Sequence, residues 1–291
     1  MKKKTPICPT TDNSLCFKVL SVAIILVLLP SLFLTAAAQT SAWELPGYKE
    51  RVKGLVVGVG STNARETYVS ESTYSGPSVT IQEDTWKGYS PLSVLNYGRT
   101  HTSVMFGSYT NSLGGGRMLY FNFDYFYSRA WNAIHTNTSD LLLGPSVMLK
   151  LGCVYDGSGS NNPATAEGYL SAGLCVDYTY RFSIKNRPLA LQVSLFSPLM
   201  GISPAPDYDQ PYWFVYKYNQ YDKLIHFAWV GNCFALKEQI SLLYPLRAGS
   251  LKVGCSLDYL GNTLGGHYRR ILDWDFTVGW VYKLRLKEMN R

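Results

Sequence analysis

Long runs of alternating apolar and polar residues constrain the fold of this chain more than any other feature of its sequence. In residues 168–182 every second residue from Leu170 is apolar or aromatic, and the interleaved positions are mostly polar or small. Residues 272–285 alternate in the same way from Leu272 to Leu284. An apolar period of two indicates a β-strand with one apolar and one polar face. The chain therefore has the pattern of an all-β protein.

Weaker segments of the same kind recur along the chain, and stretches rich in Gly, Asn, Asp, Ser and Pro separate them. They predict about twelve strands in all, within a range of 10 to 14, arranged in one domain. No long helix and no linker is expected between them. The weaker segments are residues 52–60, 65–73, 78–85, 98–109, 119–127, 140–155, 188–197, 223–235, 238–246 and 251–259.

Two all-β architectures fit such a pattern. A soluble sandwich or lipocalin-like barrel buries the apolar face and usually has strands of about five or six residues. A strand that crosses a bilayer needs about nine to eleven residues, points its apolar side chains outward and ends in aromatic residues at the membrane interfaces. The best strands here are long, and Tyr178, Tyr180 and Phe182 gather at the end of one of them. The sequence favours a transmembrane antiparallel up-and-down β-barrel, with a soluble core rich in aromatic residues as the alternative.

The N-terminal segment resembles an export signal. Three lysines open the chain, an apolar run from Val19 to Leu34 follows, and Ala36 and Ala38 form an A-x-A cleavage site. We expect a signal peptide at residues 1–38 and a mature barrel domain at residues 39–291. The alternative is an uncleaved signal anchor. Loss of the leader removes four Lys and one Asp, so the formal charge of the chain falls from +7 to +4.

Export places the mature cysteines in an oxidising compartment, where disulfides form. Strand parity puts Cys153 and Cys255 on apolar faces and Cys175 on a polar face, and it places Cys233 on the apolar side with Phe227. Thiols on opposite faces of paired strands cannot reach the roughly 4 Å Cβ separation of a disulfide. We therefore expect free thiols.

Motifs of catalysis and of metal or cofactor binding are weak in this sequence. The four histidines show no paired spacing, and no G-x-S-x-G elbow is present. His101 and Ser103 share a strand face, but neighbours on one strand seldom form a base and a nucleophile. We expect no cofactor, no metal site and no enzymatic activity, with an outer-membrane hydrolase as the less favoured reading. The basic residues form no long run, so nucleic acid is not expected as a partner.

Charged residues on the polar faces of the strands are the most informative polar set. In a barrel these side chains would line the lumen, because lipid contact costs about 2–4 kcal/mol for a Lys or Arg at the bilayer midplane. They would form either a polar conduit or a set of ion pairs that closes the interior. The residues expected to line the lumen are Asp124, Asp177, Arg181, Lys252, Asp258, Asp273, Asp275, Lys283 and Arg285.

Residues 207–221 are rich in aromatic side chains, which offer broad stacking faces for glycans or proteins. This segment is expected to be an outer loop, and it is a candidate for surface binding or adhesion. The alternative is that its rings serve in the interface belt or in loop packing. The residues proposed for binding are Tyr208, Tyr212, Trp213 and Tyr216.

A cleaved leader followed by long alternating strands, such as YLSAGLCVDYTYRF and LDWDFTVGWVYKLRL, resembles the outer-membrane β-barrel proteins of Gram-negative bacteria. More narrowly, the chain is similar to an uncharacterised barrel family of that class. The resemblance implies the outer membrane as the location, outer-membrane lipid and the barrel-assembly machinery as partners, and small solutes or glycans as ligands. It implies a small passive pore or a structural element. One departure is the polar end at Arg291, where many such barrels end in an aromatic residue.

Connection lengths give a further test, because periplasmic turns are expected to be short and outer loops long. If residues 212–218 form an extra strand, the short connections downstream fall on one side of the barrel and the long ones on the other. The same parity carried toward the N-terminus leaves one strand unpaired. The sequence therefore leaves the strand count open.

Overall fold

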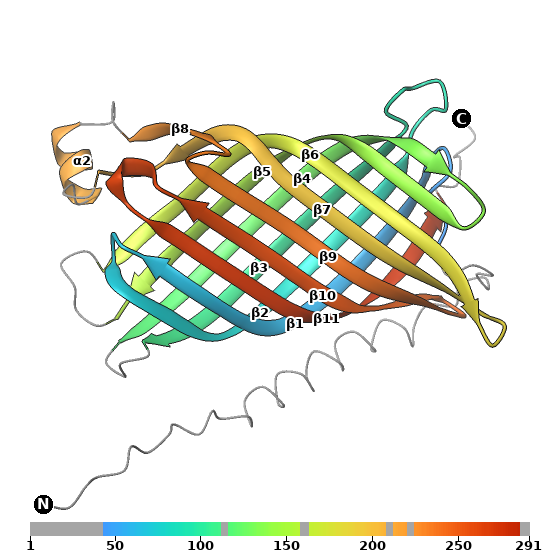
Figure 1. The fold of residues 1–291 in the computed structure, drawn as a ribbon, viewed down its shortest axis with the longest axis horizontal. Coiled ribbons are helices and arrows are strands. Elements are labelled where there is room, and N and C mark those ends of the chain that lie inside the picture. The colour runs from blue at the N-terminus through green and yellow to red at the C-terminus, as the bar shows by residue number, and fades with distance from the viewer. Residues whose placement is uncertain (1–42, 112–115, 158–162, 208–211, 220–223, 286–291) are drawn as a thin grey trace, which may run out of the picture.

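The computed structural model describes residues 43–111, 116–157, 163–207, 212–219 and 224–285, and it is dominated by strands (Figure 1). The signal peptide expected at residues 1–38 lies outside these ranges. The elements are β1 (Glu50–Glu66), β2 (Ser70–Gly88), β3 (Tyr97–Asn111), β4 (Arg117–His135), β5 (Ser139–Asp156), β6 (Ala164–Ile184), β7 (Arg187–Pro204), α2 (Tyr212–Tyr218), β8 (Ile225–Trp229), β9 (Cys233–Leu246), β10 (Gly249–Asn262), η2 (Leu264–Gly266) and β11 (Arg269–Arg285).

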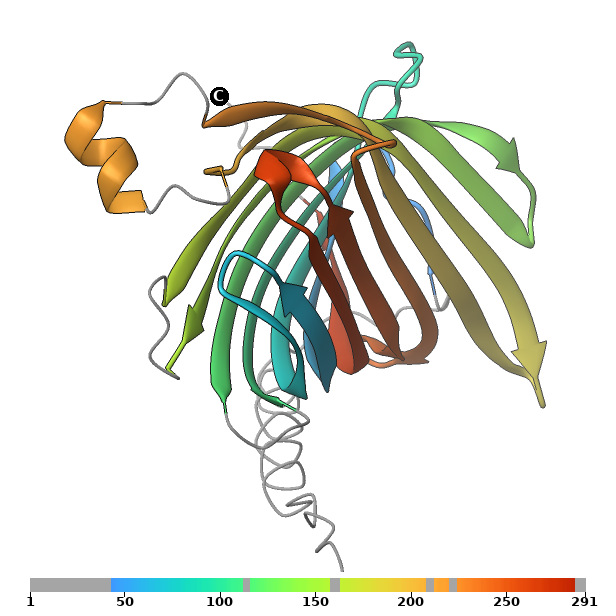
Figure 2. The same ribbon diagram turned by 60° about the vertical axis from the view of Figure 1, so that its left-hand side comes forward.

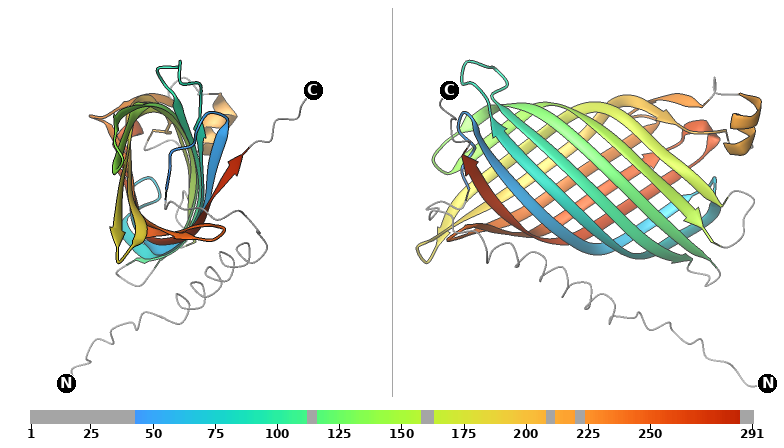
Figure 3. Two further views of the ribbon diagram at one scale, coloured as in Figure 1. Left: turned by 90° about the vertical axis from the view of Figure 1, so that its right-hand side faces the viewer. Right: turned by 180° about the vertical axis from the view of Figure 1, so that it is seen from behind.

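The strands form one antiparallel sheet that closes on itself. The sheet runs from β1 through β6 in chain order, continues through β7, β9, β10 and β11, and returns to β1 through the β1–β11 pairing. β8 pairs only with the C-terminal part of β7, at residues 200–204. Ten of the eleven strands of the described chain therefore close the barrel. The tilted strands wrap a single cylinder in all views (Figure 1, Figure 3). Closure leaves no long unpaired sheet edge.

Side chains alternate between the outside and the inside of this barrel. On β11 the outward Trp274 and Phe276 are 55% and 43% exposed, whereas the inward Asp273, Asp275 and Thr277 are buried. The other long strands show the same arrangement, with large apolar residues outside and polar residues inside. Buried polar groups in the lumen and an apolar exterior are the reverse of a soluble core and are typical of a transmembrane β-barrel. The expected fold class is confirmed.

In the described residues ten strands close the barrel, fewer than the expected twelve but within the expected range of 10 to 14. The segment expected as one strand at 65–73 contains the turn 67–69, which joins the end of β1 to the start of β2. The segment 212–218 is the short helix α2 rather than an extra strand. With that correction the parity problem disappears, because an even number of strands closes the barrel. The described residues contain no helix that is both long and apolar enough to cross a membrane.

β8 and β9 run in the same direction along β7 and are separated by a turn at residues 230–232. Both run antiparallel to β7, but the pairing register changes from Met200↔Trp229 to Phe196↔Lys237. The turn reverses the alternation, so odd-numbered residues point outward on β8 and inward on β9. Phe227 is therefore exposed, whereas Cys233 is buried inside. The parity prediction for Cys233 is therefore wrong. The four cysteines of the described residues are free thiols, and Cys153 and Cys255 are exposed.

The two ends of the barrel differ in their connections. The terminal end, where Glu50 and Arg285 lie, carries the connections 89–96, 136–138, 185–186 and 247–248. The opposite end, called the distal end below, carries the connections 67–69, 112–116, 157–163, 205–224 and 263–268. The longest of them holds α2, which lies outside the cylinder beyond β8 (Figure 2).

Candidate functional site

The lumen is the place where this chain concentrates its polar chemistry. The ribbon viewed along the barrel axis looks open (Figure 3), but side chains fill this space. Inward residues from the closing strands form successive clusters between the terminal end and the distal end.

An apolar plug covers the lumen at the terminal end. Trp43, which precedes β1, is only 4% exposed and packs edge-on against Trp86, with ring centroids 5.9 Å apart. The Nε of Arg181 donates to the backbone oxygen of Trp43 at 2.9 Å. The same arginine forms an ion pair with the buried Asp140. Trp43 is thus held inside the barrel. The cluster that it joins consists of Trp43, Val52, Trp86, Ala130, Leu142, Ala190, Leu243 and Val281.

Arg99 is the centre of the next cluster. Its guanidinium lies between two carboxylates, with Nη2 2.8 Å from Asp84 Oδ1 and Nη1 2.7 Å from Asp177 Oδ1. Lys252 Nζ lies 3.3 Å from the other oxygen of Asp84, and His101 Nδ1 lies 3.0 Å from Asp84 Oδ1. The arginine also stacks over Trp86 at 4.9 Å. Charges buried this deeply are tolerated because each has an opposite partner.

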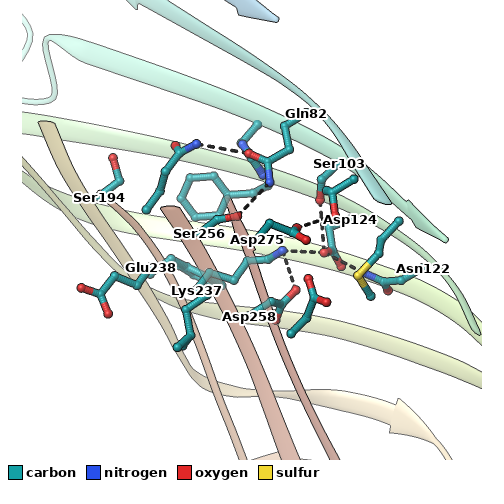
Figure 4. Close-up of a pocket in the computed structure, with 18 of the residues that line it drawn as sticks. Gln82, Ser103, Asn122, Asp124, Ser194, Lys237, Glu238, Ser256, Asp258 and Asp275 are labelled. Carbon is teal, nitrogen blue, oxygen red and sulfur yellow. Dashed lines mark hydrogen bonds and ion pairs between the residues drawn. The ribbon is translucent and has the colours of Figure 1, made fainter. Parts of the chain in front are cut away.

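Two lysines and two aspartates form the central cluster. Lys237 Nζ lies 2.5 Å from Asp124 Oδ2 and 2.8 Å from Asp258 Oδ2. Lys150 Nζ joins the same two carboxylates at 3.6 and 3.2 Å. Figure 4 shows Lys237 reaching from its strand toward both aspartates. The cluster carries two positive and two negative charges and therefore balances itself.

A cavity of about 60 Å³ lies between the Arg99 cluster and the central cluster. Gln82 and Ser256 border it, and Gln82 Nε2 lies 3.4 Å from Ser256 Oγ. A water molecule needs about 10–15 Å³ of such volume, so the cavity has room for only a few waters. Residues of both clusters line it, together with Phe126 and Phe196.

Asp273 and Asp275 lie side by side on β11 and differ from the other lumenal acids in their partners. Ser78 Oγ donates to Asp273 Oδ1 at 2.8 Å, and Thr80 Oγ1 donates to Asp275 Oδ2 at 2.6 Å. Thr62 also donates to Asp273. No lysine, arginine or histidine of the described residues forms an ion pair with either carboxylate. Hydroxyl groups and the neighbouring acid, rather than a cation, are the partners of each carboxylate.

A last cluster closes the lumen near the distal end. Arg269 forms an ion pair with Glu66, and its Nη1 lies 3.8 Å from Glu167 Oε2. Tyr120 donates to Glu167 at 3.2 Å. The large side chains of Tyr109 and Met118 are fully buried beside it. Polar and apolar groups together fill the cross-section here.

The structure places eight of the nine residues expected to line the lumen on the inner face of the barrel. Asp124, Asp177, Lys252, Asp273 and Asp275 are buried there. Of the others, Asp258 belongs to the central cluster, while Arg181 and Lys283 lie near the terminal end, where Lys283 pairs with Glu50 at 2.7 Å. The backbone of Arg285 ends β11, and its side chain lies outside the described part of the structure.

The aromatic segment takes a form that the sequence did not indicate. Residues 212–218 are helical, which corrects the expectation of a loop through this stretch. Tyr208 lies outside the described residues, as do the side chains of Tyr212, Trp213 and Tyr216, so their role stays a prediction.

Sequence reasoning missed several residues that organise the lumen. Arg99, Asp84 and Lys150 lie on the inward parity of segments that were recognised as strands. Extending the alternation rule to those weaker strands would have found them. Trp43 carried no such signal, because it precedes the first strand.

His101 and Ser103 contact different acidic residues. His101 contacts Asp84, and Ser103 donates to Asp124 Oδ2 at 3.3 Å. In the described parts of the chain, no group of three or more His, Cys, Asp or Glu residues is arranged to hold a metal ion.

Comparison with known proteins identifies the family. A family model described as "Protein of unknown function (DUF3316)" matches residues 24–290. The chain belongs to this family. A search of the curated proteins finds no match.

Solved outer-membrane barrels are similar in fold to this DUF3316 protein. The outer membrane protease OmpT from Escherichia coli matches with a TM-score of 0.48 and 8% identity, covering 84% of this chain and 100% of that one. The transport unit of the autotransporter AIDA-I from Escherichia coli matches with a TM-score of 0.40 and 7% identity, covering 89% and 94%. An outer membrane channel from Pseudomonas putida F1 matches with a TM-score of 0.34 and 12% identity, covering 86% and 100%. We assign no activity from these matches.

Proposed function

We propose that this protein is a closed, structural β-barrel of the Gram-negative outer membrane, with its distal end facing outward and no enzymatic activity. The filled lumen supports the closed state. The short connections 185–186 and 247–248 at the terminal end and the long connection 205–224 at the distal end support the orientation, because periplasmic turns are usually the shorter ones. The apolar exterior supports membrane insertion.

The order of the clusters along the barrel carries the proposal. An ion that entered the lumen would meet the Trp43 plug, the Arg99 cluster, the central cluster and the Arg269 cluster in turn. Each obstacle is held by hydrogen bonds or ion pairs that an ion would have to break. Separation of a buried ion pair costs several kcal/mol. We therefore expect a barrel that stays closed, rather than the small passive pore that is the other possibility for its fold.

Planar bilayer recordings test the proposal. The purified protein, shown to be folded by its shift on unheated gels, is expected to give a current no larger than that of the empty bilayer. A variant without residues 43–47 should also stay closed, because the three charged clusters remain. Stepwise conductance of the wild-type protein would contradict the proposal. Density fractionation of cells tests the location, which would be wrong if the folded protein sedimented with inner membranes.

Surface attachment through residues 207–221 is a second candidate function. The longest connection of the barrel contains this segment and lies at the distal end, where α2 projects beyond the cylinder (Figure 2). A variant that lacks 207–221 but still shifts on unheated gels is expected to lose attachment to glycan or protein surfaces that the wild type binds. Equal attachment by both proteins would exclude this function.

A further inference from the structure

Two arginines face each other on the outer surface of the barrel near its distal end. Arg65 of β1 and Arg270 of β11 are direct partners in the antiparallel register. Their chain neighbours Ala64, Glu66 and Ile271 are buried inside, so both arginines point outward. The side chain of Arg65 is 41% exposed. The register thus places two positive charges next to each other on the face that meets the membrane.

This arrangement is unfavourable without an anion. Like charges that lie directly opposite on paired strands destabilise the pair. Glu71 offers only partial compensation, since its Oε2 lies 3.4 Å from Arg65 Nη2 and its side chain is 67% exposed. Asn63 Oδ1 accepts a hydrogen bond from Arg270 Nη2 at 3.2 Å but brings no charge. The three ionised side chains therefore leave a net positive charge at this point.

The surroundings mark this point as the border between lipid tails and headgroups. Along the outer face of β11, the exposed Trp274 and the apolar Leu272 lead directly to Arg270. Tyr268 lies beside the pair, with its ring centroid 5.7 Å from Arg65 Cζ. Aromatic rings of this kind are enriched at headgroup depth in membrane proteins. The two arginines therefore lie where a lipid phosphate would be found.

A tyrosine covers the position beside Arg270 on the neighbouring strand. The partner of Arg270 on β10 is Gly261, which has no side chain. A Cβ at this glycine would lie 2.7 Å from the hydroxyl oxygen of Tyr259, so the tyrosine hydroxyl lies over the glycine that faces Arg270 in the register. A hydroxyl donor beside two guanidinium groups is suited to a phosphate oxygen.

We propose that Arg65 and Arg270 bind the phosphate of an anionic membrane lipid in the leaflet that surrounds the distal end. The planar guanidinium groups can each donate two hydrogen bonds to one phosphate. The bound phosphate removes the repulsion between the two arginines, and the lipid chains lie along the apolar row that begins at Leu272. The inference needs the membrane-spanning fold but not the closed state of the lumen.

Lipid retention in native mass spectrometry tests the site. The full-length mature protein is purified in a neutral detergent and titrated with phosphatidylglycerol, and bound copies are counted. R65Q and R270Q are each expected to lower the affinity of the tightest lipid about tenfold, as loss of a charged hydrogen bond implies. Arg117 supplies the matched control, because it is also an exposed outward arginine at the distal end but faces Thr110 across the pair. R117Q should retain lipid as the wild type does.

The outcomes separate the site from general attraction to positive charge. Equal retention by wild type, R65Q and R270Q overturns the proposal, and so does an equal loss in R117Q. Displacement of the lipid by millimolar inorganic phosphate would show a free-anion site and would also overturn it. A second measurement uses stability in nanodiscs. In phosphatidylcholine alone, R65Q is expected to unfold at a higher midpoint than the wild type. With phosphatidylglycerol added, it is expected to unfold at a lower midpoint than the wild type. A difference of the same sign in both lipids contradicts the site.

Discussion

Arg99 reaches across the β2–β3 pair and binds Asp84 through two nitrogens, Nε at 3.1 Å and Nη2 at 2.8 Å from the same oxygen. The contact is diagonal, because the direct partner of Arg99 in the register is Trp86. The remaining nitrogen of the guanidinium binds Asp177, which comes from β6 on another part of the barrel wall. One side chain thus connects strands that are distant in the sequence, and the lumen is cross-linked as well as filled.

Replacement of Arg99 is expected to destabilise the barrel strongly. R99Q leaves Asp177 without the cation that contacts it and weakens the neutralisation of Asp84, and removal of one partner from a buried ion pair costs about 3–5 kcal/mol. Urea unfolding of the protein in micelles, followed by tryptophan fluorescence, measures this loss. R99K keeps the charge and should show an intermediate loss. The exposed control R117Q should change stability by less than about 0.5 kcal/mol. An unchanged midpoint for R99Q would mean that the cluster contributes nothing.

Replacement of Asp275 is expected to have the opposite effect and to stabilise the barrel. Because no cation of the described residues pairs with either carboxylate of Asp273 and Asp275, D275N relieves the repulsion between the two acids and keeps a polar side chain of the same size. We expect a gain of roughly 1–3 kcal/mol in the free energy of unfolding at neutral pH. D124N is the matched comparison, since Asp124 contacts both Lys150 and Lys237 and its loss should cost about 3 kcal/mol. Parallel urea titrations test the contrast, and equal effects of the two variants would argue against it.

The outer and inner faces of the barrel could be predicted because alternation is a local property of the sequence. Each strand shows it without reference to its neighbours, and residues 272–285 display it from end to end. The strand boundaries could not be predicted equally well. β1 and β2 are joined by residues 67–69, and alternation alone gives no sign that the pattern at 65–73 contains a tight turn.

The contacts inside the lumen depend on information that a single strand does not carry. Cys233 lies inside because a turn at 230–232 changes the phase of alternation, and only the pairing with β7 reveals it. Which lysine meets which aspartate depends on the stagger of strands around the whole barrel. Lys237 and Asp124, 113 residues apart, are joined in this way. The sequence indicates that such charges face inward, and the closed geometry decides that they pair.

Truncation of Trp43 is expected to release residues 43–49 from the lumen while leaving the strands in place. The indole is buried between Trp86 and the end of the lumen, and loss of a buried Trp side chain costs about 3–5 kcal/mol. Tryptic cleavage after Lys49 should therefore accelerate roughly a hundredfold or more in W43A, with the heat shift of the barrel unchanged. Glu44, the exposed neighbour of Trp43, supplies the control, and E44A should be cleaved at the wild-type rate. Equal rates for W43A and wild type would show that the segment is not held by this side chain.

His267 predicts a pH dependence at the distal end. It lies in the connection between η2 and β11, its Nε2–H donates to the oxygen of Pro206 at 2.6 Å, and its ring meets Tyr68 edge-on at 4.8 Å. Burial lowers the pKa of His267, and the hydrogen bond to Pro206 opposes this only in part. Because packing lowers the pKa of His267, the connection 263–268 binds more protons after it unpacks than while it is packed. The packed state is therefore fully stable above the ordinary histidine pKa of about 6.5 and loses stability as the pH falls below it.

Hydrogen exchange read by mass spectrometry tests this sign. After correction for the intrinsic exchange rate, residues 203–207 and 263–268 should lose protection between neutral pH and about pH 5, by at most about tenfold for each pH unit. Residues 126–134 of β4, which lie toward the terminal end, should keep their protection over the same range. H267Q retains a side-chain amide that can donate to Pro206 but does not titrate, so its protection should be independent of pH. Loss of protection in H267Q equal to that of the wild type would assign the effect to another group.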